Sequence, residues 1–291
     1  MEDPRALLQK ADKALAGASG GWSLFGAKED KLLGAVDMYI AAANAFKMQK
    51  ADREAGQTFE KAAQIQNSKL NEPDDAANTY MDAFKAYAKA SPEDAARCAE
   101  IAIQQYCKKG NFRRAAGLKE KLGELYEMDL GDLKRAVSAY EAGAEWYEGD
   151  GAAVLANKLW LKVADIAAVD GDYYKAIEAY EKVAQASINN NLMKYSVKDY
   201  FLKAGLCHLA TKDMISARRA LEKYTEMDPN FPREREHKLL VDICDAVSDN
   251  NREKFEDDLA AFDRMTKLDK WKTTILLRIK EQIEEADNEF S

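Results

Sequence analysis

Small and aromatic residues recur along the chain with the spacing of one face of an α-helix. Ala35, Tyr39, Ala42 and Phe46 lie at relative positions 0, 4, 7 and 11, which fall on one side of a helix. The same spacing occurs at Ala76, Tyr80, Ala83 and Tyr87, and at Ala136, Tyr140, Gly143 and Tyr147. A small residue lets two helices approach, and the aromatic ring that follows fills the space between them. The pattern therefore predicts amphipathic helices that pack along this face.

These predicted helices follow one another at a nearly constant interval. Further copies of the pattern begin at Ala55, Ala96, Ala116, Ala156 and Ala176, with a last weak one at Ala217. From residue 35 to residue 176 the starts fall every 20 or 21 residues, which leaves room for one helix and a short turn. Turn-forming residues separate the helices at 71–75, 91–94, 108–112, 148–151 and 170–174. We therefore predict an all-α, right-handed superhelical solenoid of TPR-like helical hairpins, and not a compact bundle with accidental periodicity.

The two ends of the chain depart from this repeat. The first helix is predicted to have Asp3 as its N-cap, Pro4 at its first position and Gly17 just past its end. After residue 190 the repeat fades, and the Pro-broken connection at 228–236 precedes three helical segments at 237–249, 252–267 and 268–286. We therefore expect a solenoid over residues 1–230 and a C-terminal helical bundle with an acidic tail over residues 231–291.

Composition narrows the class of protein. The chain has 291 residues, of which 47% are hydrophobic and 32% charged, so it is expected to be globular. Its net charge of −8 argues against general nucleic-acid binding. It contains no run of 18 apolar residues, no N-terminal signal peptide, and only four scattered cysteines. These features predict a reduced, cytoplasmic protein.

Motifs for catalysis are nearly absent from the sequence. There is no Gly-Lys dipeptide, hence no P-loop, and no dinucleotide-binding, zinc-protease or serine-hydrolase signature. The two histidines, His208 and His237, are far apart. The adjacent pair Cys207 and His208 is better explained by a packed helix than by a thiol catalyst or a metal ligand. We therefore expect no enzyme activity, no cofactor and no metal, but a curved surface that binds other proteins.

Charge is distributed unevenly along the chain. Residues 108–121 contain six basic residues and one acid, and Lys158 and Lys162 lie four residues apart on one predicted helix face. The segment 192–203 adds Lys194, Lys198 and Lys203. By contrast, residues 281–291 contain five acids and no lysine or arginine. Such runs often only solubilise a surface, but their order predicts an acidic partner in the middle of the chain and a basic partner near its end.

Several longer stretches resemble the alpha-SNAP family of soluble NSF attachment proteins over essentially the whole chain. They are "FRRAA" (112–116), "AGAEWYEGD" (142–150), "ANKLWLKVAD" (156–165), "KYSVKDYFLKAGLCHLA" (194–210), "DPNFPRERE" (228–236) and "LDKWKTTILLRIK" (268–280). The resemblance implies an adaptor that grips the four-helix SNARE complex and recruits the hexameric ATPase NSF. The ATPase then pulls the SNARE proteins apart after membrane fusion.

The resemblance also implies roles for individual residues. Lys158 and Lys162 match family lysines that contact SNAREs, and Leu192 and Tyr195, with Lys194 between them, match a second contact. A further family lysine falls on Gly117, so Arg113, Arg114 or Lys119 is left to replace it. The family's acidic contacts with the ATPase fall on Asp213, Asp245 and Asp249. The tail adds Glu284, Glu285, Asp287 and Glu289, with Phe290 in place of the family's terminal leucine.

An apolar stretch near the N-terminus has two possible explanations. Trp22, Leu24 and Phe25 lie among glycines in a segment, 17–29, that is expected to be a loop. The family carries an apolar loop here that dips into the membrane, which would make the protein peripherally membrane-associated. Alternatively, the three side chains could fasten the first helix onto the second. As a whole, the chain could also be a generic helical-repeat scaffold for a peptide or a coiled coil, since the repeats alone do not specify the partner.

Overall fold

The chain folds into α-helices joined by short turns. The computed structural model describes residues 3–19 and 25–289, with side chains at 3–18 and 28–283. The first helices are α1 (Pro4–Ser19), α2 (Phe25–Met48), α3 (Asp52–Ile65), α4 (Pro73–Ala90), α5 (Pro92–Lys108), α6 (Phe112–Met128) and α7 (Leu133–Gly149). They are followed by α8 (Ala153–Asp170), α9 (Tyr173–Ser187), α10 (Val197–Ala210), α11 (Met214–Met227), α12 (Arg235–Ser248), α13 (Arg252–Met265) and α14 (Lys270–Glu289). Within the described ranges there is no strand, which confirms the all-α class.

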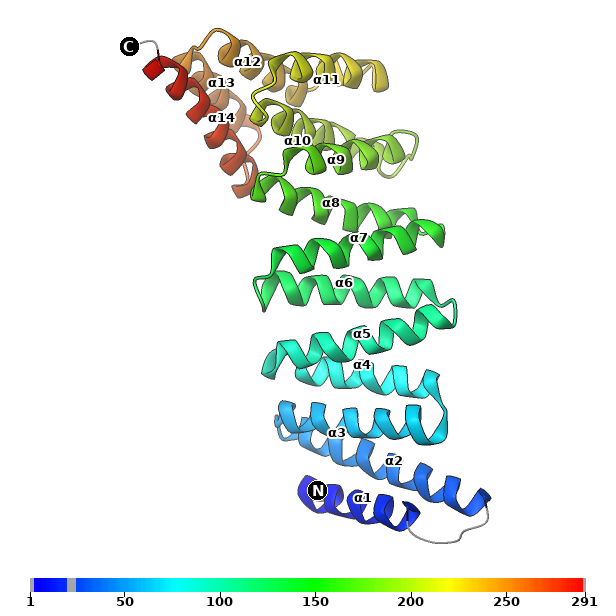
Figure 1. The fold of residues 1–291 in the computed structure, drawn as a ribbon. Coiled ribbons are helices and arrows are strands. Elements are labelled where there is room, and N and C mark those ends of the chain that lie inside the picture. Colours follow the sequence, from blue (N-terminus) through cyan, green and yellow to red (C-terminus); the bar gives the residue numbers. More distant parts are fainter. Residues whose placement is uncertain (1–2, 20–24, 290–291) are drawn as a thin grey trace. The chain divides into compact units, whose positions relative to one another are not determined.

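The predicted repeat is the packing pattern of these helices. The eight alanines that open its copies, from Ala35 in α2 to Ala176 in α9, are each at most 4% exposed. The aromatic residues four positions later, such as Tyr39, Phe59 and Tyr140, are buried with them. Figure 1 shows α1 to α7 as successive antiparallel helices. The helical-hairpin repeat is therefore confirmed.

The turns between helices recur with the same interval. The backbone adopts positive φ at Gly110, Gly131, Gly151 and Gly171, each one to three residues past a helix end. Glycine adopts this left-handed conformation without the steric cost that a Cβ atom brings. On the far side of two of these turns, Asp132 and Asp172 accept a backbone N–H bond from Arg135 and Lys175 and so cap the next helix. A glycine with positive φ therefore ends one helix, and an aspartate N-cap begins the next.

Two compact units make up the chain, residues 1–152 and residues 153–291. In the first unit, a tyrosine hydroxyl repeatedly donates to a carboxylate 27 residues earlier. The hydroxyl of Tyr39 donates to Asp12 at 2.6 Å, that of Tyr87 to Glu60 at 3.3 Å, and that of Tyr147 to Glu120 at 3.4 Å. Each pair connects a buried ring to an acid on a preceding helix, so the hydroxyl is satisfied without leaving the core.

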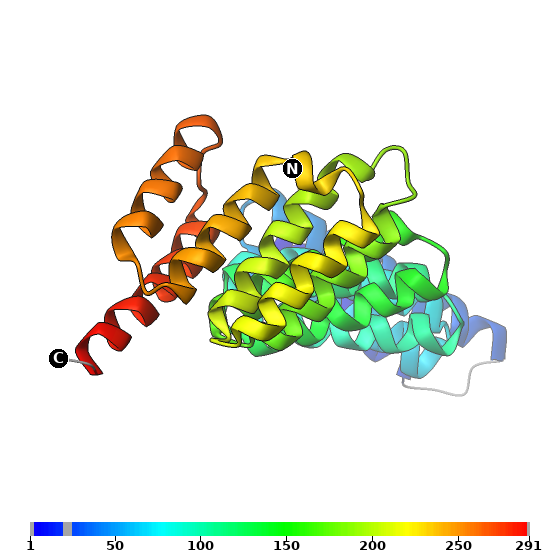
Figure 2. The ribbon, with the colours of Figure 1, turned by 90° about the horizontal axis from the view of Figure 1, so that it is seen from above.

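The second unit is organised around α14. Figure 2 shows α13 and α14, in orange and red, beside α12. Trp271 donates its indole N–H to the carbonyl of Asp165 at 3.1 Å, and Arg278 donates to the carbonyl of Val169 at 2.6 Å. The carbonyls that Arg278 binds, those of Ala168 and Val169, lie in the last turn of α8, where no helical N–H remains to bind them. The guanidinium also brings positive charge to the negative end of the helix dipole.

A stack of aromatic rings fills the core of this second unit. The ring centroids of Phe201 and Tyr224 are 4.5 Å apart, and Phe231 packs edge-on against Phe201 at 5.1 Å. Phe231 belongs to a short 3₁₀ turn, Phe231–Arg233, within the Pro-broken connection, and it is fully buried. The core cluster continues from α8 through α14 without a break at residue 230. The domain boundary predicted there stays a prediction, and the contacts themselves divide the chain after residue 152.

The N-terminal segment differs from the prediction in one respect. Asp3 caps α1 as expected, since its carboxylate accepts the backbone N–H of Arg5 at 3.1 Å. However, α1 continues past Gly17 to Ser19, and α2 begins at Phe25, so the loop is shorter than residues 17–29. Ala18 is 7% exposed, and its burial favours the additional turn of helix over the predicted glycine stop.

Candidate functional site

Basic residues of α6 lie in different surroundings despite their closeness in sequence. The side chain of Arg113 is 66% exposed and pairs with Asp150 at 3.2 Å. The guanidinium of Arg114 lies 4.5 Å from the ring centroid of Tyr106 and donates to Asn78 at 2.7 Å. Arg113 is therefore the more solvated of the two, whereas Arg114 is held against the helices that precede it.

The neighbouring Lys119 and Gly117 are less suited to contact a partner. Lys119 is only 16% exposed and pairs with Glu100 at 2.8 Å. A Cβ atom at Gly117 would come within 3.2 Å of the hydroxyl of Tyr147, so this position faces α7. Arg113 consequently remains the α6 cation with the most accessible charge of those that have a described ion pair.

Lys158 and Lys162 lie on one face of α8, as predicted. Lys158 is exposed and Lys162 half-buried, whereas Leu159 and Val163, one position further on, are fully buried in the core. The two lysines belong to residues 153–291, and Arg113 and Arg114 belong to residues 1–152. A continuous basic stripe through both groups stays a prediction.

The connection between α9 and α10 exposes two large apolar side chains. Leu192 is 90% exposed and Tyr195 74% exposed, although hydrophobic residues of this size are usually at least partly buried. The ammonium group of Lys194 lies 5.4 Å from the ring centroid of Tyr195. An exposed apolar pair beside a cation is the composition expected of a protein-binding surface.

A groove of about 620 Å³ opens next to Tyr195 and is bordered by residues from the α11–α12 connection. Three cations line it, Lys194, Lys198 and Arg233. The ammonium group of Lys198 pairs with Glu234 at 3.0 Å, and this hydrogen bond raises the pKa of Lys198. Two acids, Asp228 and Glu234, line the groove as well, so it joins charged residues of the α9–α10 connection to a segment more than 30 residues further along the chain.

Acidic residues gather at one end of the α11–α12 hairpin. Arg218 of α11 pairs with Asp245 of α12 at 3.1 Å, and the two helices run in opposite directions. Asp213 at the start of α11 and Asp249 at the end of α12 therefore lie at the same end, and both are exposed. Asp213 also caps α11, because its carboxylate accepts the backbone N–H of Ser216 at 3.0 Å. Hydrogen bonds from Ser216 lower the pKa of Asp213, which keeps it charged.

The last described part of α14 reaches this same end. Gln282 donates to the carbonyl of Ala210 at 3.2 Å, three residues before Asp213. The predicted tail residues follow at once along α14, but the side chains of Glu284, Glu285, Asp287 and Glu289 lie outside the described part, as does Phe290. Trp22 and Leu24 also lie outside the described residues, and of Phe25 only the backbone is described, as the first residue of α2.

The residues considered for chemistry are core residues. Cys207 is fully buried, and burial raises the pKa of its thiol, so the thiolate required of a nucleophile is disfavoured. Burial likewise raises the pKa of Cys98 to about 12. Among the side chains that the structure describes, no group of three or more His, Cys, Asp or Glu residues is arranged to hold a metal ion. None of the described helices has the length and apolar character needed to cross a bilayer.

Comparison with known proteins shows the family of this chain. The family model described as "Soluble NSF attachment protein, SNAP" matches residues 2–284. The chain belongs to the SNAP family. A Neurospora crassa protein described as a probable vesicular-fusion protein sec17 homolog is 60% identical over 99% of both chains. The alpha-soluble NSF attachment proteins of Saccharomyces cerevisiae and Homo sapiens are 40% and 39% identical, over 100% and 96% of this chain and 100% and 94% of theirs.

The SNAP-family chain has two surface features that sequence reasoning did not assign. Arg233 joins the groove beside Tyr195, and Arg218 orients Asp245 at the acidic end. Both arginines lie next to residues that are 27 or more positions away in the sequence, so no local sequence pattern predicts these neighbours. The charged residues in "ARRALEKY" (217–224) and "PRERE" (232–236) mark both segments as polar, but they do not identify these contacts.

Proposed function

We propose that this SNAP-family chain is an adaptor that binds the assembled four-helix SNARE complex and recruits and stimulates the ATPase NSF, which then disassembles the complex in vesicle fusion. The chain acts by binding and not by catalysis. The family membership over residues 2–284 is the observation on which the proposal rests. The separation of a basic, apolar surface from an acidic end supports it, because an adaptor needs two surfaces for two partners.

The SNARE-binding surface is proposed to comprise Arg113, Arg114, Lys158, Lys162 and the α9–α10 connection with Leu192, Lys194 and Tyr195. A pull-down with assembled SNARE complex as bait, with and without NSF, tests the function. The adaptor prefers the assembled bundle over single SNARE strands and brings NSF with it. Equal retention by single strands would instead favour the alternative, a generic scaffold for a peptide or coiled coil.

Charge reversal tests the basic part of this surface. Replacing Lys158 and Lys162 with Glu should weaken binding of the SNARE complex, because several screened ion pairs of about 0–1 kcal/mol each are lost. The loss should be larger at low salt, where screening is weaker. Lys267→Glu is the control, since Lys267 lies in the connection between α13 and α14, its side chain is 81% exposed, and its described ion pair is with Asp263 four residues away. An unchanged affinity at both salt concentrations would contradict the electrostatic model.

The ATPase-binding surface is proposed to comprise Asp213, Asp245, Asp249 and the tail from Glu284 to Phe290. Asp213→Asn together with Asp249→Asn should reduce the stimulation of NSF and leave SNARE binding intact. Asparagine serves as an N-cap about as well as aspartate, so α11 should keep its start while the charge is lost. Deletion of residues 284–291, which leaves Gln282 and the buried Ile283 in place, should act in the same way. Normal stimulation by both variants would show that NSF binds elsewhere.

A weak membrane contact through Trp22, Leu24 and Phe25 is proposed as a third part of the function. Each side chain could gain up to about 1.5–3 kcal/mol on full burial in an apolar phase, and several adaptors on one SNARE complex would add their effects. Replacing all three with Ser should impair disassembly of SNAREs in liposomes but not of soluble SNARE fragments. Equal impairment of both, with a lower melting temperature, would indicate that the side chains only fasten α1 to α2.

A further inference from the structure

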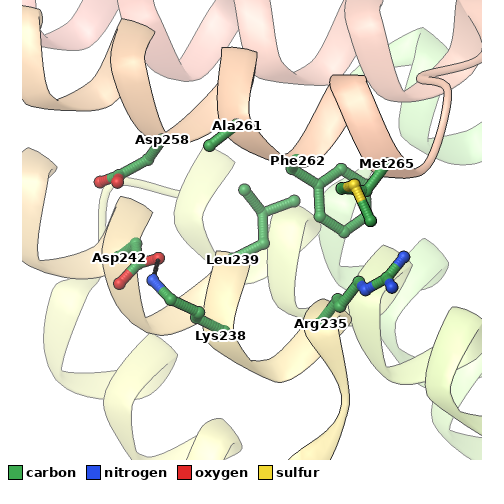
Figure 3. Close-up of a pocket in the computed structure, with 8 residues that line it drawn as sticks. All are labelled: Arg235, Lys238, Leu239, Asp242, Asp258, Ala261, Phe262 and Met265. Carbon is green, nitrogen blue, oxygen red and sulfur yellow. Dashed lines mark hydrogen bonds and ion pairs between the residues drawn. The ribbon is translucent and has the colours of Figure 1, made fainter.

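A second groove lies between α12 and α13, on residues to which neither of the proposed partners is assigned. It encloses about 220 Å³. Figure 3 shows Leu239 and Phe262 in its middle, Met265 and Arg235 toward one end, and Asp242 and Asp258 at the other. Leu239 and Phe262 are buried, whereas the side chain of Met265 is 65% exposed. The floor is therefore apolar and the two ends carry opposite charge.

The acidic end of this groove lacks a counter-ion for one carboxylate. The ammonium group of Lys238 pairs with Asp242, four residues further along α12. The carboxylate oxygen Oδ2 of Asp258 is buried and has no hydrogen-bond partner among the described residues. Burial and the neighbouring Asp242 raise the pKa of Asp258, and Lys238 and Lys254 only partly offset this effect. A charged carboxylate in this position is therefore unfavourable unless a cation from outside completes it.

We propose that this groove binds an amphipathic helix of a partner protein, which inserts one apolar side chain beside Leu239 and Phe262 and places a lysine or arginine at Asp258. At the opposite end, Arg235 accepts an acidic residue of the same helix. Arg235 and Asp242 are seven residues apart on α12, or about 10 Å along the helix axis. Residues i, i+4 and i+7 of a docked helix span the same length and lie on one face.

The occupant is defined by this charge arrangement. A helix with acid, apolar residue and base at these three positions meets a complementary group at each of them. A helix with two acids faces repulsion at Asp242 and Asp258, and one with two bases faces repulsion at Arg235. Like charges placed opposite each other at an interface oppose binding, so the groove selects among helices by charge as well as by shape.

Binding can be measured with the full-length chain and a defined probe. The probe is a labelled synthetic helix of about 16 residues with Glu, Leu and Lys at positions i, i+4 and i+7. Fluorescence anisotropy reports its affinity, and the methyl signal of Met265 reports where it binds. We expect saturable binding with a shift of that signal. Replacing the Leu with Ser should weaken binding about tenfold or more, and replacing the Lys with Glu should weaken it by at least about fivefold.

Substitutions in the chain separate binding from folding. Asp258→Asn should lower the affinity for the Lys-containing probe about three- to fivefold. It should not lower the melting temperature, because it removes an uncompensated charge from the folded chain. Asp257→Asn is the matched control, since Asp257 is the adjacent acid on α13 but does not line the groove, and it should bind like the parent. SNARE binding and NSF stimulation should be unchanged by both substitutions, so this inference and the proposed function fail independently.

Three outcomes would overturn the proposal. The first is the absence of any saturable shift at Met265. The second is equal affinity for the Lys- and Glu-containing probes. The third is a Met265 signal that moves with protein concentration in the absence of probe, which would identify the groove as an interface between copies of this chain.

Discussion

The helices α2 to α7 and the helices α10 to α14 use different ways to build a core. In the first group, each helix packs against the next one in sequence through alanines and buried tyrosines that return every 20 or 21 residues. In the second group, Phe201, Tyr224 and Phe231 come from three different segments and meet in one stack. The first group repeats one interface, whereas the second converges on one centre.

This difference predicts a difference in cooperativity. In a repeat array, stability is approximately a sum of hairpin and nearest-neighbour terms, so damage stays local. In a convergent core, a single side chain contacts several elements, and its loss is transmitted to all of them. Substitutions of matched kind in the two groups can therefore test whether the two cores behave as their packing suggests.

The largest effect is expected at Phe231. Phe231→Ala should cost about 3–5 kcal/mol, because it leaves a cavity among the rings of Phe201, Tyr224 and His237. Hydrogen exchange should accelerate in α10, α11 and α12 together. Phe59→Ala in α3 is the counterpart in the repeat, and its effect should be confined to neighbouring helices. If both substitutions accelerate exchange across similarly many helices, the comparison between the two cores is wrong.

A somewhat smaller effect is expected at Glu181 of α9. Burial alone would raise its pKa, but contacts with His208, Lys223 and Tyr224 lower the pKa to about 2. Lys223 and Tyr224 donate hydrogen bonds to its two oxygens, at 2.5 Å and 2.8 Å, whereas His208 Nε2 lies 3.6 Å away, beyond hydrogen-bond length. Glu181→Gln should therefore destabilise the chain by about 2–3 kcal/mol at pH 7.

The pH dependence gives the Glu181 prediction a sign. A carboxyl whose pKa is lower in the folded chain stabilises the fold above its unfolded pKa, and this contribution disappears as the pH falls toward the folded value. The difference in unfolding free energy between parent and Glu181→Gln should therefore shrink between about pH 5 and about pH 2. A difference that stays constant over this range, measured by urea denaturation, would assign the effect to packing.

A third prediction concerns the close approach of helices in the repeat. A Cβ atom at Gly56 would lie 2.6 Å from the ring of Tyr87, so Gly56→Ala should cost about 1–3 kcal/mol despite the better helix propensity of alanine. Gly34→Ala is the control, because nothing lies within 4 Å of the added atom. The melting temperature should fall for Gly56→Ala, whereas it should stay the same or rise for Gly34→Ala.

The smallest effect is expected from the repeated tyrosine–carboxylate pairs. Tyr39→Phe removes the hydroxyl that donates to Asp12 at 2.6 Å and should cost about 1 kcal/mol. Tyr87→Phe should cost less, since its bond to Glu60 is 3.3 Å long and Glu60 also pairs with Arg97. Equal losses in denaturant midpoint would show that hydrogen-bond geometry does not set the contribution of these pairs.

The candidate sites were predictable only in part. The sequence placed Lys158 and Lys162 on one helix face, because a spacing of four residues determines this in any α-helix. It also marked Leu192 and Tyr195, which the structure exposes. It did not reveal that Arg218 pairs with Asp245, or that Arg233 borders the groove next to Tyr195. These contacts depend on how helices that are far apart in sequence are placed next to each other, and no local sequence pattern specifies that placement.

By itself, the sequence determined the helices, their turns and the alternation of alanine and tyrosine that packs each helix against the next. The reason is that both partners in such a contact lie within one or two repeats, so a periodic pattern encodes them. Only the tertiary structure decided that Arg278 of α14 binds two carbonyls at the end of α8, more than 100 residues earlier. Any helix end presents such carbonyls, and the choice of donor follows from the shared core of α8 to α14, where many distant side chains must fit at once.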